Sequence, residues 1–130
     1  KTTNIICDKK NKWGGYTSYG TASSRLQNGN LIQGKKIKVS EYGARYNIWK
    51  INTGYKKSTK DDIAYQHPAI FPEQLAKDHI LTWSNKGDIV LDPMCGSGTS
   101  CKMAKETGRK FIGIDIGKEY CDIAKERING

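Results

Sequence analysis

The second half of the chain alternates between helical periodicity and short apolar runs. Ile80 and Trp83 recur at helical spacing after Pro72, whose missing N–H costs nothing in the first turn of a helix. The run over 89–91 is too short and too β-branched for a helix, and it predicts a buried strand. In order, the pattern predicts a helix after Pro72, a strand over 89–91, a helix over 99–107, a strand over 111–114 and a helix over 118–128. Strands that alternate with helices predict an α/β fold of parallel strands with flanking helices.

The first half of the chain has a different pattern. Between residues 9 and 43 there are six glycines and long polar intervals, with too few periodic apolar positions for a stable helix. We expect this segment to be rich in loops. Strand-favouring residues return over 45–51 and predict a short strand there. The pattern therefore divides the chain into a loop-rich segment over 1–44 and a folded part over 45–130.

The charge distribution follows the same division. Residues 1–60 hold 13 Lys and Arg against two carboxylates, a net charge of +11, whereas residues 61–130 hold 9 against 11, a net charge of −2. A basic excess in one segment, interleaved with aromatic residues, favours contact with a polyanion, and nucleic acid is the partner that we expect. The alternative is a lysine-rich face that is merely solvated. The candidate nucleic-acid contacts are Lys9, Lys10, Lys12, Arg25, Lys35, Lys36, Lys38 and Arg45.

One stretch in the folded part carries most of the chemical information. It reads Ile-Val-Leu-Asp-Pro-Met-Cys-Gly-Ser-Gly-Thr at 89–99 and continues with Lys-Phe-Ile-Gly-Ile-Asp at 110–115. An apolar run that ends in Asp92, a glycine turn that opens a helix and a second run that ends in Asp115 describe a β-loop-α-β unit. Units of this kind bind nucleoside-containing ligands at the carboxyl ends of their strands.

The residue types in that unit limit the ligand further. Gly96 and Gly98 let the backbone turn sharply, and the N–H groups that begin the next helix attract a carboxylate or phosphate. Asp92 would repel a pyrophosphate but accepts hydrogen bonds from an ammonium or hydroxyl group. Asp115 ends the next strand about 20 residues later, a position from which a carboxylate binds ribose hydroxyls. These requirements fit S-adenosylmethionine, with the methionine moiety by Asp92 and the glycine turn and the ribose by Asp115.

Other interpretations of these residues are weaker. The glycine turn alone could be an ordinary tight turn. The chain lacks the Gly-x-x-x-x-Gly-Lys-Ser/Thr sequence of P-loop ATPases, and Cys101 stands where a dinucleotide site would have a third glycine. The four cysteines form no Cys-x-x-Cys pair, and no His lies at zinc-ligand spacing, so we expect reduced thiols in a cytosolic protein and no metal site. No apolar run approaches the roughly 18 residues of a membrane span.

Residues 67–128 resemble the C-terminal part of the DNA amino-methyltransferases, in the subgroup whose cofactor motifs follow the catalytic motif. The sequence His-Pro-Ala-Ile-Phe-Pro at 67–72 resembles the segment that these enzymes place before the glycine loop. Residues 92–99 resemble their Asp-Pro-Phe-x-Gly-Ser-Gly-Thr loop, and residues 108–115 resemble their second cofactor motif. Two positions depart from the common pattern, since Met94 replaces a frequent Phe and Asp115 replaces a frequent Glu.

The resemblance implies a partial Rossmann-like methyltransferase fold, preceded by a loop-rich basic segment that belongs to the target-recognition region. It implies methyl transfer from S-adenosylmethionine to N6 of adenine or N4 of cytosine in double-stranded DNA, in the cytoplasm of a bacterium or during phage infection, typically in a restriction–modification system. His67 has a second interpretation, which is to fix the backbone before Pro68. The cofactor-binding residues that the resemblance implies are His67, Phe71, Asp92, Pro93, Met94, Gly96, Ser97, Gly98, Thr99 and Asp115.

One motif of the family is missing from the sequence. Catalysis in the family uses an Asp/Asn/Ser-Pro-Pro-Tyr/Phe/Trp tetrapeptide, which accepts hydrogen bonds from the exocyclic amine and stacks on the flipped base. The three prolines of this chain, Pro68, Pro72 and Pro93, are never adjacent. Because the first residue is Lys1 rather than Met, we expect the motif to lie upstream, so that the chain holds no catalytic residue and is inactive alone. The alternatives are a non-catalytic nucleic-acid-binding domain with a degenerate methyltransferase fold, and a methyltransferase for RNA or a small molecule.

Overall fold

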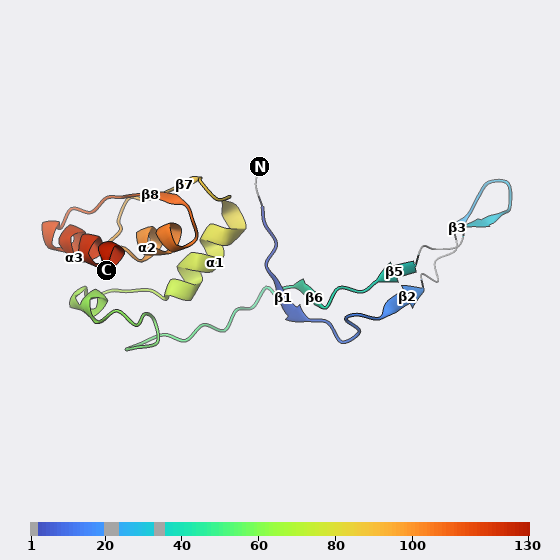
Figure 1. Ribbon diagram of the computed structural model, residues 1–130, viewed down its shortest axis with the longest axis horizontal. Coiled ribbons are helices and arrows are strands. Elements are labelled where there is room, and N and C mark those ends of the chain that lie inside the picture. The colour runs from blue at the N-terminus through green and yellow to red at the C-terminus, as the bar shows by residue number, and fades with distance from the viewer. Residues whose placement is uncertain (1–2, 20–23, 33–35) are drawn as a thin grey trace. The chain divides into compact units, whose positions relative to one another are not determined.

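The computed structural model describes residues 3–19, 24–32 and 36–130, and its contacts divide the chain into two units (Figure 1). The first unit comprises Lys1–Ile6 and Ile48–Gly130, and the second comprises Cys7–Asn47. Among the described residues, every α-helix belongs to the first unit, whereas the second contains only short antiparallel strands.

The first unit is a β-α-β unit with a helix on either side of it in the sequence. Its elements are the 3-10 helix η1 (Asp62–Gln66), α1 (Glu73–Trp83), β7 (Ile89–Asp92), α2 (Thr99–Glu106), β8 (Lys110–Gly113) and α3 (Lys118–Asn129). Strands β7 and β8 pair in parallel, with Ile89 opposite Lys110 and Asp92 opposite Gly113. The helices and strands predicted for this half, and the fold of parallel strands with flanking helices, are confirmed to within one residue at each end.

Local sequence explains where these helices begin and end. Helix α1 starts directly after Pro72, whose φ of −62° already suits the first turn. Gly108 follows the last turn of α2 with a φ of +75°, the left-handed conformation that commonly ends a helix. In the part of the chain that the structure describes, no helix is long and apolar enough to cross a bilayer.

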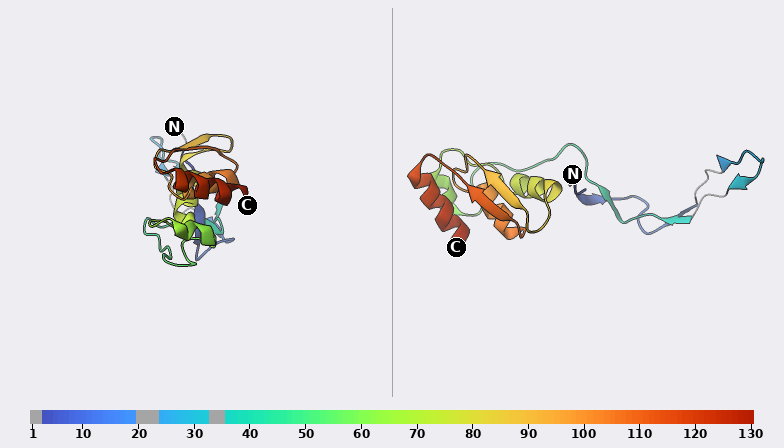
Figure 2. Two further views of the ribbon diagram at one scale, coloured as in Figure 1. Left: turned by 90° about the vertical axis from the view of Figure 1, so that its left-hand side faces the viewer. Right: turned by 90° about the horizontal axis from the view of Figure 1, so that it is seen from above.

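The core of the first unit lies between two helices and one face of the strands. Ala76 and Ile80 of α1 pack with Met103 and Ala104 of α2, and Val90 of β7 packs against this cluster. Figures 1 and 2 show the three α-helices on the same side of the β7–β8 pair. The crossover helix is thereby fixed against the sheet, and the loop that opens it lies at the carboxyl end of β7.

The other face of the two strands is open. Ile89, Leu91 and Ile112 are 62%, 60% and 50% exposed, and the parallel register places them on the face opposite Val90. No element among the described residues covers this face. The prediction of a buried strand over 89–91 is therefore wrong, because helices on only one side of a sheet leave every second side chain in solvent.

The second unit, Cys7–Asn47, is a two-stranded arm that we call the β-arm. Its antiparallel pairs are β1 (Cys7–Lys10) with β6 (Tyr42–Ala44), β2 (Thr17–Tyr19) with β5 (Lys36–Lys38) and β3 (Ser24–Arg25) with β4 (Leu31–Ile32). The pairs are nested around a turn in which Gly29 has a φ of +84°. None of the described side chains of the β-arm is buried.

The β-arm corrects two expectations for the first half of the chain. The segment expected to be rich in loops also contains six short strands, because backbone pairing in a two-stranded ladder needs no periodic apolar face. The strand predicted over 45–51 is wrong, since β6 ends at Ala44 and no strand follows until β7.

Asn4, which precedes the β-arm in the chain, belongs to the first unit and binds the end of α1. The backbone N–H of Asn4 donates to the carbonyl of Thr82 at 2.7 Å, and its side-chain amide donates to the carbonyl of Ser84 at 2.9 Å. Both acceptors lie at the end of α1. The contacts therefore divide the chain at 6/7 and 47/48, whereas the sequence pattern suggested one boundary after residue 44.

Candidate functional site

The turn between β7 and α2, residues 93–98, is a glycine loop at the carboxyl end of the parallel pair. Gly96 and Gly98 have φ values of +49° and +77°, a conformation that favours glycine. A Cβ atom at Gly96 would lie 2.9 Å from Nε2 of His67, and one at Gly98 would lie 2.8 Å from Cβ of Ala124. Both glycines are thus required by the backbone conformation and by close neighbours.

Asp115, two residues after β8, binds the glycine loop directly. Its Oδ2 accepts a hydrogen bond from the backbone N–H of Gly96 at 2.8 Å, and its Oδ1 accepts one from Gly117 at 2.9 Å. These two hydrogen bonds lower the pKa of the Asp115 carboxyl, that from Gly117 first. Each carboxylate oxygen keeps a further lone pair with which it can accept a hydrogen bond from a ligand hydroxyl.

His67 covers the other side of the glycine loop. Its Nδ1 accepts a hydrogen bond from the backbone N–H of Ala69 at 3.1 Å, so the neutral ring carries its proton on Nε2, the atom that faces Gly96. The ring packs edge-on against Tyr120 of α3, with 4.3 Å between the ring centroids. His67 therefore fixes the local backbone and also forms part of the wall opposite the loop.

A cavity of about 280 Å³ lies between the 67–71 segment, the glycine loop and the start of α3. Seven of the predicted cofactor residues line it: His67, Phe71, Met94, Gly96, Ser97, Thr99 and Asp115. Three others, Asp92, Pro93 and Gly98, do not line it. Four lining residues were not predicted, namely Ala69, Ile70, Cys95 and Tyr120. The signal that could have identified Tyr120 is its place at the start of the helix that follows Asp115.

Asp92 supports the loop from its own side chain. Its Oδ1 accepts a hydrogen bond from the backbone N–H of Met94 at 3.2 Å, and its carbonyl accepts one from Ile114 at 2.9 Å. Asp92 and Asp115 both act on the thiol of Cys95, whose pKa is raised by burial first and then by these two carboxylates. The two strand-end aspartates therefore flank the same loop, although only Asp115 reaches the cavity.

The surroundings of the cysteines near the loop disfavour the reactive thiolate form. All four cysteines are free thiols. Burial raises the pKa of Cys101 to about 11, and Cys95 is shifted in the same direction. A thiol becomes a nucleophile only as the thiolate, so neither group is prepared for covalent catalysis.

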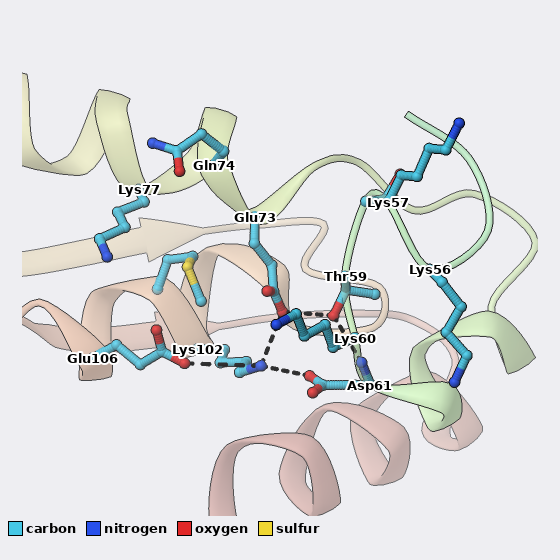
Figure 3. A pocket seen from close by; sticks show the side chains of 12 residues that line it. Lys56, Lys57, Thr59, Lys60, Asp61, Glu73, Gln74, Lys77, Lys102 and Glu106 are labelled. Atoms are coloured by element: carbon cyan, nitrogen blue, oxygen red, sulfur yellow. Dashed lines mark hydrogen bonds and ion pairs between the residues drawn. The ribbon is translucent and has the colours of Figure 1, made fainter. Parts of the chain in front are cut away.

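A larger cavity of about 440 Å³ lies between the 56–61 segment, α1 and α2 (Figure 3). Its three carboxylates, those of Asp61, Glu73 and Glu106, are all paired with Lys102. Lys102 donates to Asp61 at 2.6 Å and to Glu73 at 2.9 Å, and Figure 3 shows both carboxylates turned toward its ammonium group. Because the carboxylates of this cavity are already paired with Lys102, and because no glycine turn borders it, the smaller cavity is the candidate ligand site.

Most predicted nucleic-acid contacts lie on the β-arm with their side chains exposed. Lys36 and Lys38 alternate on β5 and therefore share a face of the ladder. Lys9 lies over the ring of Tyr46 at 4.9 Å, and Lys12 lies over Trp13 at 5.3 Å. The remaining predicted contacts are the exposed Lys10 and Arg25, the partly buried Arg45, and Lys35, which lies outside the described residues.

Arg45 forms an ion pair with a carboxylate on the opposite strand. Its Nε donates to Oδ2 of Asp8 at 2.8 Å, across the β1–β6 end of the β-arm. This hydrogen bond lowers the pKa of the Asp8 carboxyl. The pair reduces the net charge at that end of the arm, which leaves Lys36 and Lys38 on a more basic surface.

The fold and the cavity define an α/β unit for a nucleoside-type ligand, and comparison with known proteins gives its family. A family model of DNA methylases, the N6_N4_Mtase family, matches residues 4–126. The chain belongs to this DNA methylase family.

Individual relatives agree with the family assignment. The chain is 54% identical over 129 residues to the orphan methyltransferase M.BamHII of Bacillus amyloliquefaciens, a match that covers 98% of the chain and 49% of the relative. It is 44% identical over 82 residues to the type II methyltransferase M2.LlaDCHI of Lactococcus lactis subsp. cremoris, covering 63% of the chain and 29% of the relative. The chain thus spans about half the length of M.BamHII and less of M2.LlaDCHI.

A solved structure shows a similar arrangement. The crystal structure of the M1.HpyAVI–SAM complex is 38% identical to the chain, with a TM-score of 0.51, and the match covers 64% of this chain and 37% of that one. The methyltransferase type of α/β fold expected from the sequence is therefore confirmed.

Proposed function

We propose that this chain forms the S-adenosylmethionine site and part of the DNA-contacting surface of a DNA methyltransferase that modifies N6 of adenine or N4 of cytosine. The observation that supports this proposal most directly is the cavity in which the 67–71 segment, the glycine loop and Asp115 meet. The family assignment and the M1.HpyAVI–SAM complex support the same ligand.

The residues present fit S-adenosylmethionine. The first turn of α2 presents unpaired N–H groups at Thr99, beside the cavity, and these favour the carboxylate of the methionine moiety. Asp115 is ionised at neutral pH and can accept hydrogen bonds from ribose hydroxyls. Phe71 and Tyr120 offer aromatic surface. Asp92 holds the backbone at Met94, and its direct contact with the cofactor stays a prediction.

The cavity of about 280 Å³ is close to the lower limit of small-molecule sites, roughly 300 Å³. We infer that these residues hold the methionine and ribose parts of the cofactor, and that the rest of the methyltransferase domain completes the site. The open face of β7 and β8 supports this inference, because parallel sheets are normally covered on both faces. M.BamHII has about twice the length of the matched region, which is enough chain to cover that face.

S-adenosylmethionine supplies an electrophilic methyl group on its sulfonium, so the protein needs no nucleophile of its own. This agrees with the raised thiol pKa values of Cys95 and Cys101. Since the 130 residues contain no Pro-Pro-aromatic tetrapeptide, the groups that hold the target amine come from outside them. The role of this chain is to bind and orient the cofactor and to contact double-stranded DNA through the β-arm.

Calorimetric titration with S-adenosylmethionine tests the cofactor site. We expect weak binding by the chain and a loss of affinity of about 10- to 100-fold in Asp115→Ala, since hydrogen bonds to a charged group contribute about 1.5–3 kcal/mol. Asp122→Ala is the matched control, because Asp122 is an exposed carboxylate on α3 whose ion-pair partner is Lys125. No heat with the unchanged chain at millimolar ligand, or equal affinity in both variants, would contradict the proposed site.

A non-catalytic nucleic-acid-binding domain is the second candidate function. The exposed basic side chains of the β-arm and the missing tetrapeptide favour it. Such a domain would bind duplex DNA but give no S-adenosylmethionine heat in the same titration. A methyltransferase for RNA would instead bind the cofactor and prefer RNA to duplex DNA in a competition measurement.

A further inference from the structure

Helix α3 carries a buried arginine that the sequence analysis did not single out. The side chain of Arg127 is only 1% exposed, and its guanidinium donates to six acceptors on three segments of the chain. An arginine is rarely buried unless its charge is paired and its N–H groups are bonded, and here both conditions hold.

One edge of the guanidinium binds the glycine loop and the start of α2. Nη1 donates to the carbonyl of Ser97 at 3.0 Å, to the Ser97 hydroxyl at 3.3 Å and to Oγ1 of Thr99 at 2.9 Å. Ser97 and Thr99 both line the candidate cofactor cavity. Arg127 itself does not line it.

The other edge binds residues that come before and after the 67–71 segment, which forms the opposite wall. Nε donates to Oδ2 of Asp61 at 2.8 Å, and Nη2 donates to Oε1 of Glu73 at 2.7 Å and to Oγ1 of Thr59 at 3.2 Å. Asp61 and Glu73 stand on either side of the 67–71 segment in the sequence. One planar group therefore joins the glycine-loop wall to the two residues between which the 67–71 wall is held in the chain.

We propose that Arg127 is a positioning residue for the cofactor, which sets the separation and orientation of the glycine loop and the 67–71 segment. This inference rests on the proposed S-adenosylmethionine site. The geometry needs an arginine, because a guanidinium has five donors in a rigid plane, whereas a lysine ammonium is a single point charge that cannot bond both sets of acceptors in fixed directions.

The ion pairs around Arg127 indicate that it fixes the geometry of the glycine loop more than it stabilises the fold. Asp61 and Glu73 are shared by Arg127 and Lys102, so two carboxylates meet two cations. Figure 3 shows the Lys102 half of this cluster. A buried ion-pair cluster is weak evidence for stability, since its desolvation offsets much of its attraction. What distinguishes Arg127 from Lys102 is its set of contacts with Ser97 and Thr99.

Lys102 therefore provides a matched control. Its side chain is 17% exposed and forms ion pairs with the same two carboxylates and with Glu106, whereas its contact with the loop is a backbone hydrogen bond to the carbonyl of Gly98, which a side-chain substitution keeps. Lys102→Met removes a cation from the cluster without touching the loop. Arg127→Met removes a cation and also the loop contacts, and Arg127→Lys keeps the charge while removing the planar fork.

Two measurements on the 130-residue chain test the proposal. Titration with S-adenosylmethionine should show at least a 10-fold loss of affinity in Arg127→Met and in Arg127→Lys, and less than a 3-fold loss in Lys102→Met, with urea unfolding reporting the stability of each variant. Amide hydrogen exchange of residues 96–99 without ligand should accelerate in both Arg127 variants and stay near the parent rate in Lys102→Met.

The possible outcomes distinguish a failure of the proposed function from a failure of the inference about Arg127. If the parent chain does not bind S-adenosylmethionine, the proposed function fails, and the exchange rates still decide whether Arg127 positions the loop. If the parent chain binds and folded Arg127→Lys binds equally well with parent exchange rates, the inference about Arg127 is wrong. Equal losses of affinity in Arg127→Lys and Lys102→Met would also overturn it, because they would show an effect of charge or stability alone. If Arg127→Met does not fold, Arg127→Lys decides.

Discussion

The first unit and the β-arm hold their backbones in place by different means. In the first unit, Ala76, Ile80, Met103 and Ala104 form a buried cluster, and Arg127 binds three segments at once. In the β-arm, none of the described side chains is buried, and the order comes from strand pairs of two to four residues. A two-stranded ladder of this kind is marginally stable by itself in water.

This difference matches the two kinds of ligand that we propose. A small cofactor is bound by donors and acceptors at fixed positions, and such positions require a packed scaffold behind the loop that carries them. DNA is bound by many weakly directional phosphate contacts, which an exposed basic ribbon can provide and can adjust on binding. The rigid part and the adaptable part of the chain thus lie in separate units.

The largest effect that we predict comes from a glycine in the packed unit. Gly98→Ala should lower the free energy of unfolding by about 2–5 kcal/mol, because the new Cβ would combine a left-handed φ with overlap on Ala124. Gly29→Ala in the β-arm has a similar φ of +84° but no atom within 4 Å of the new Cβ, so it should leave the unfolding of the first unit unchanged. Urea denaturation monitored by circular dichroism at 222 nm measures both. Equal losses in the two variants would show that the packing difference is unimportant.

A smaller effect is expected from charge on the β-arm. Lys36→Gln together with Lys38→Gln should weaken duplex DNA binding and reduce the slope of log affinity against log salt by about 2, since each phosphate contact contributes about 0.9. S-adenosylmethionine affinity should not change. The matched control is Lys110→Gln with Lys118→Gln, which removes the same charge from exposed positions of the first unit. Fluorescence anisotropy over a salt series gives the slopes, and equal slopes for the two double variants would remove the β-arm from the DNA surface.

The two regions also differ in how far the sequence predicted them. The elements of the first unit follow from apolar periodicity and from Pro72 and Gly108, which act locally. The strands of the β-arm escaped prediction because their pairing uses backbone groups, which leave no trace in side-chain pattern. Arg127 escaped for another reason, since its partners lie 28 to 68 residues away and nothing local distinguishes it from a solvated helix residue.

The candidate site also combines features that local sequence predicts with others that it does not. The glycine loop and Asp115 were predicted because each belongs to a contiguous motif, and both border the cavity. The direct role expected of Asp92 stays a prediction, because it depends on where the side chain points, and in the structure its Oδ1 accepts a hydrogen bond from the N–H of Met94. Sequence spacing placed the two aspartates at neighbouring strand ends but could not determine which of them enters the cavity.

The smallest effect that we predict is a difference between the first unit and the β-arm in acid unfolding. Burial acts to raise the pKa of Asp61, but hydrogen bonds from Lys102 and Arg127 outweigh it, so that the folded-state pKa lies below its ordinary value. A carboxyl with a lowered pKa stabilises the fold above its unfolded pKa of about 4, and this contribution is lost as the pH falls through the folded value. Asp61→Asn should therefore be less stable than the parent chain at pH 7, with the difference shrinking below about pH 4.

Asp8 also has a lowered pKa, but it lies in the exposed β-arm, and screening by solvent makes its pair with Arg45 contribute little. Thermal unfolding of the first unit, measured between pH 7 and pH 2, should thus respond to Asp61→Asn and not to Asp8→Asn. The same response in both variants would show that the buried network around Arg127 is no better shielded from water than an ion pair on the β-arm.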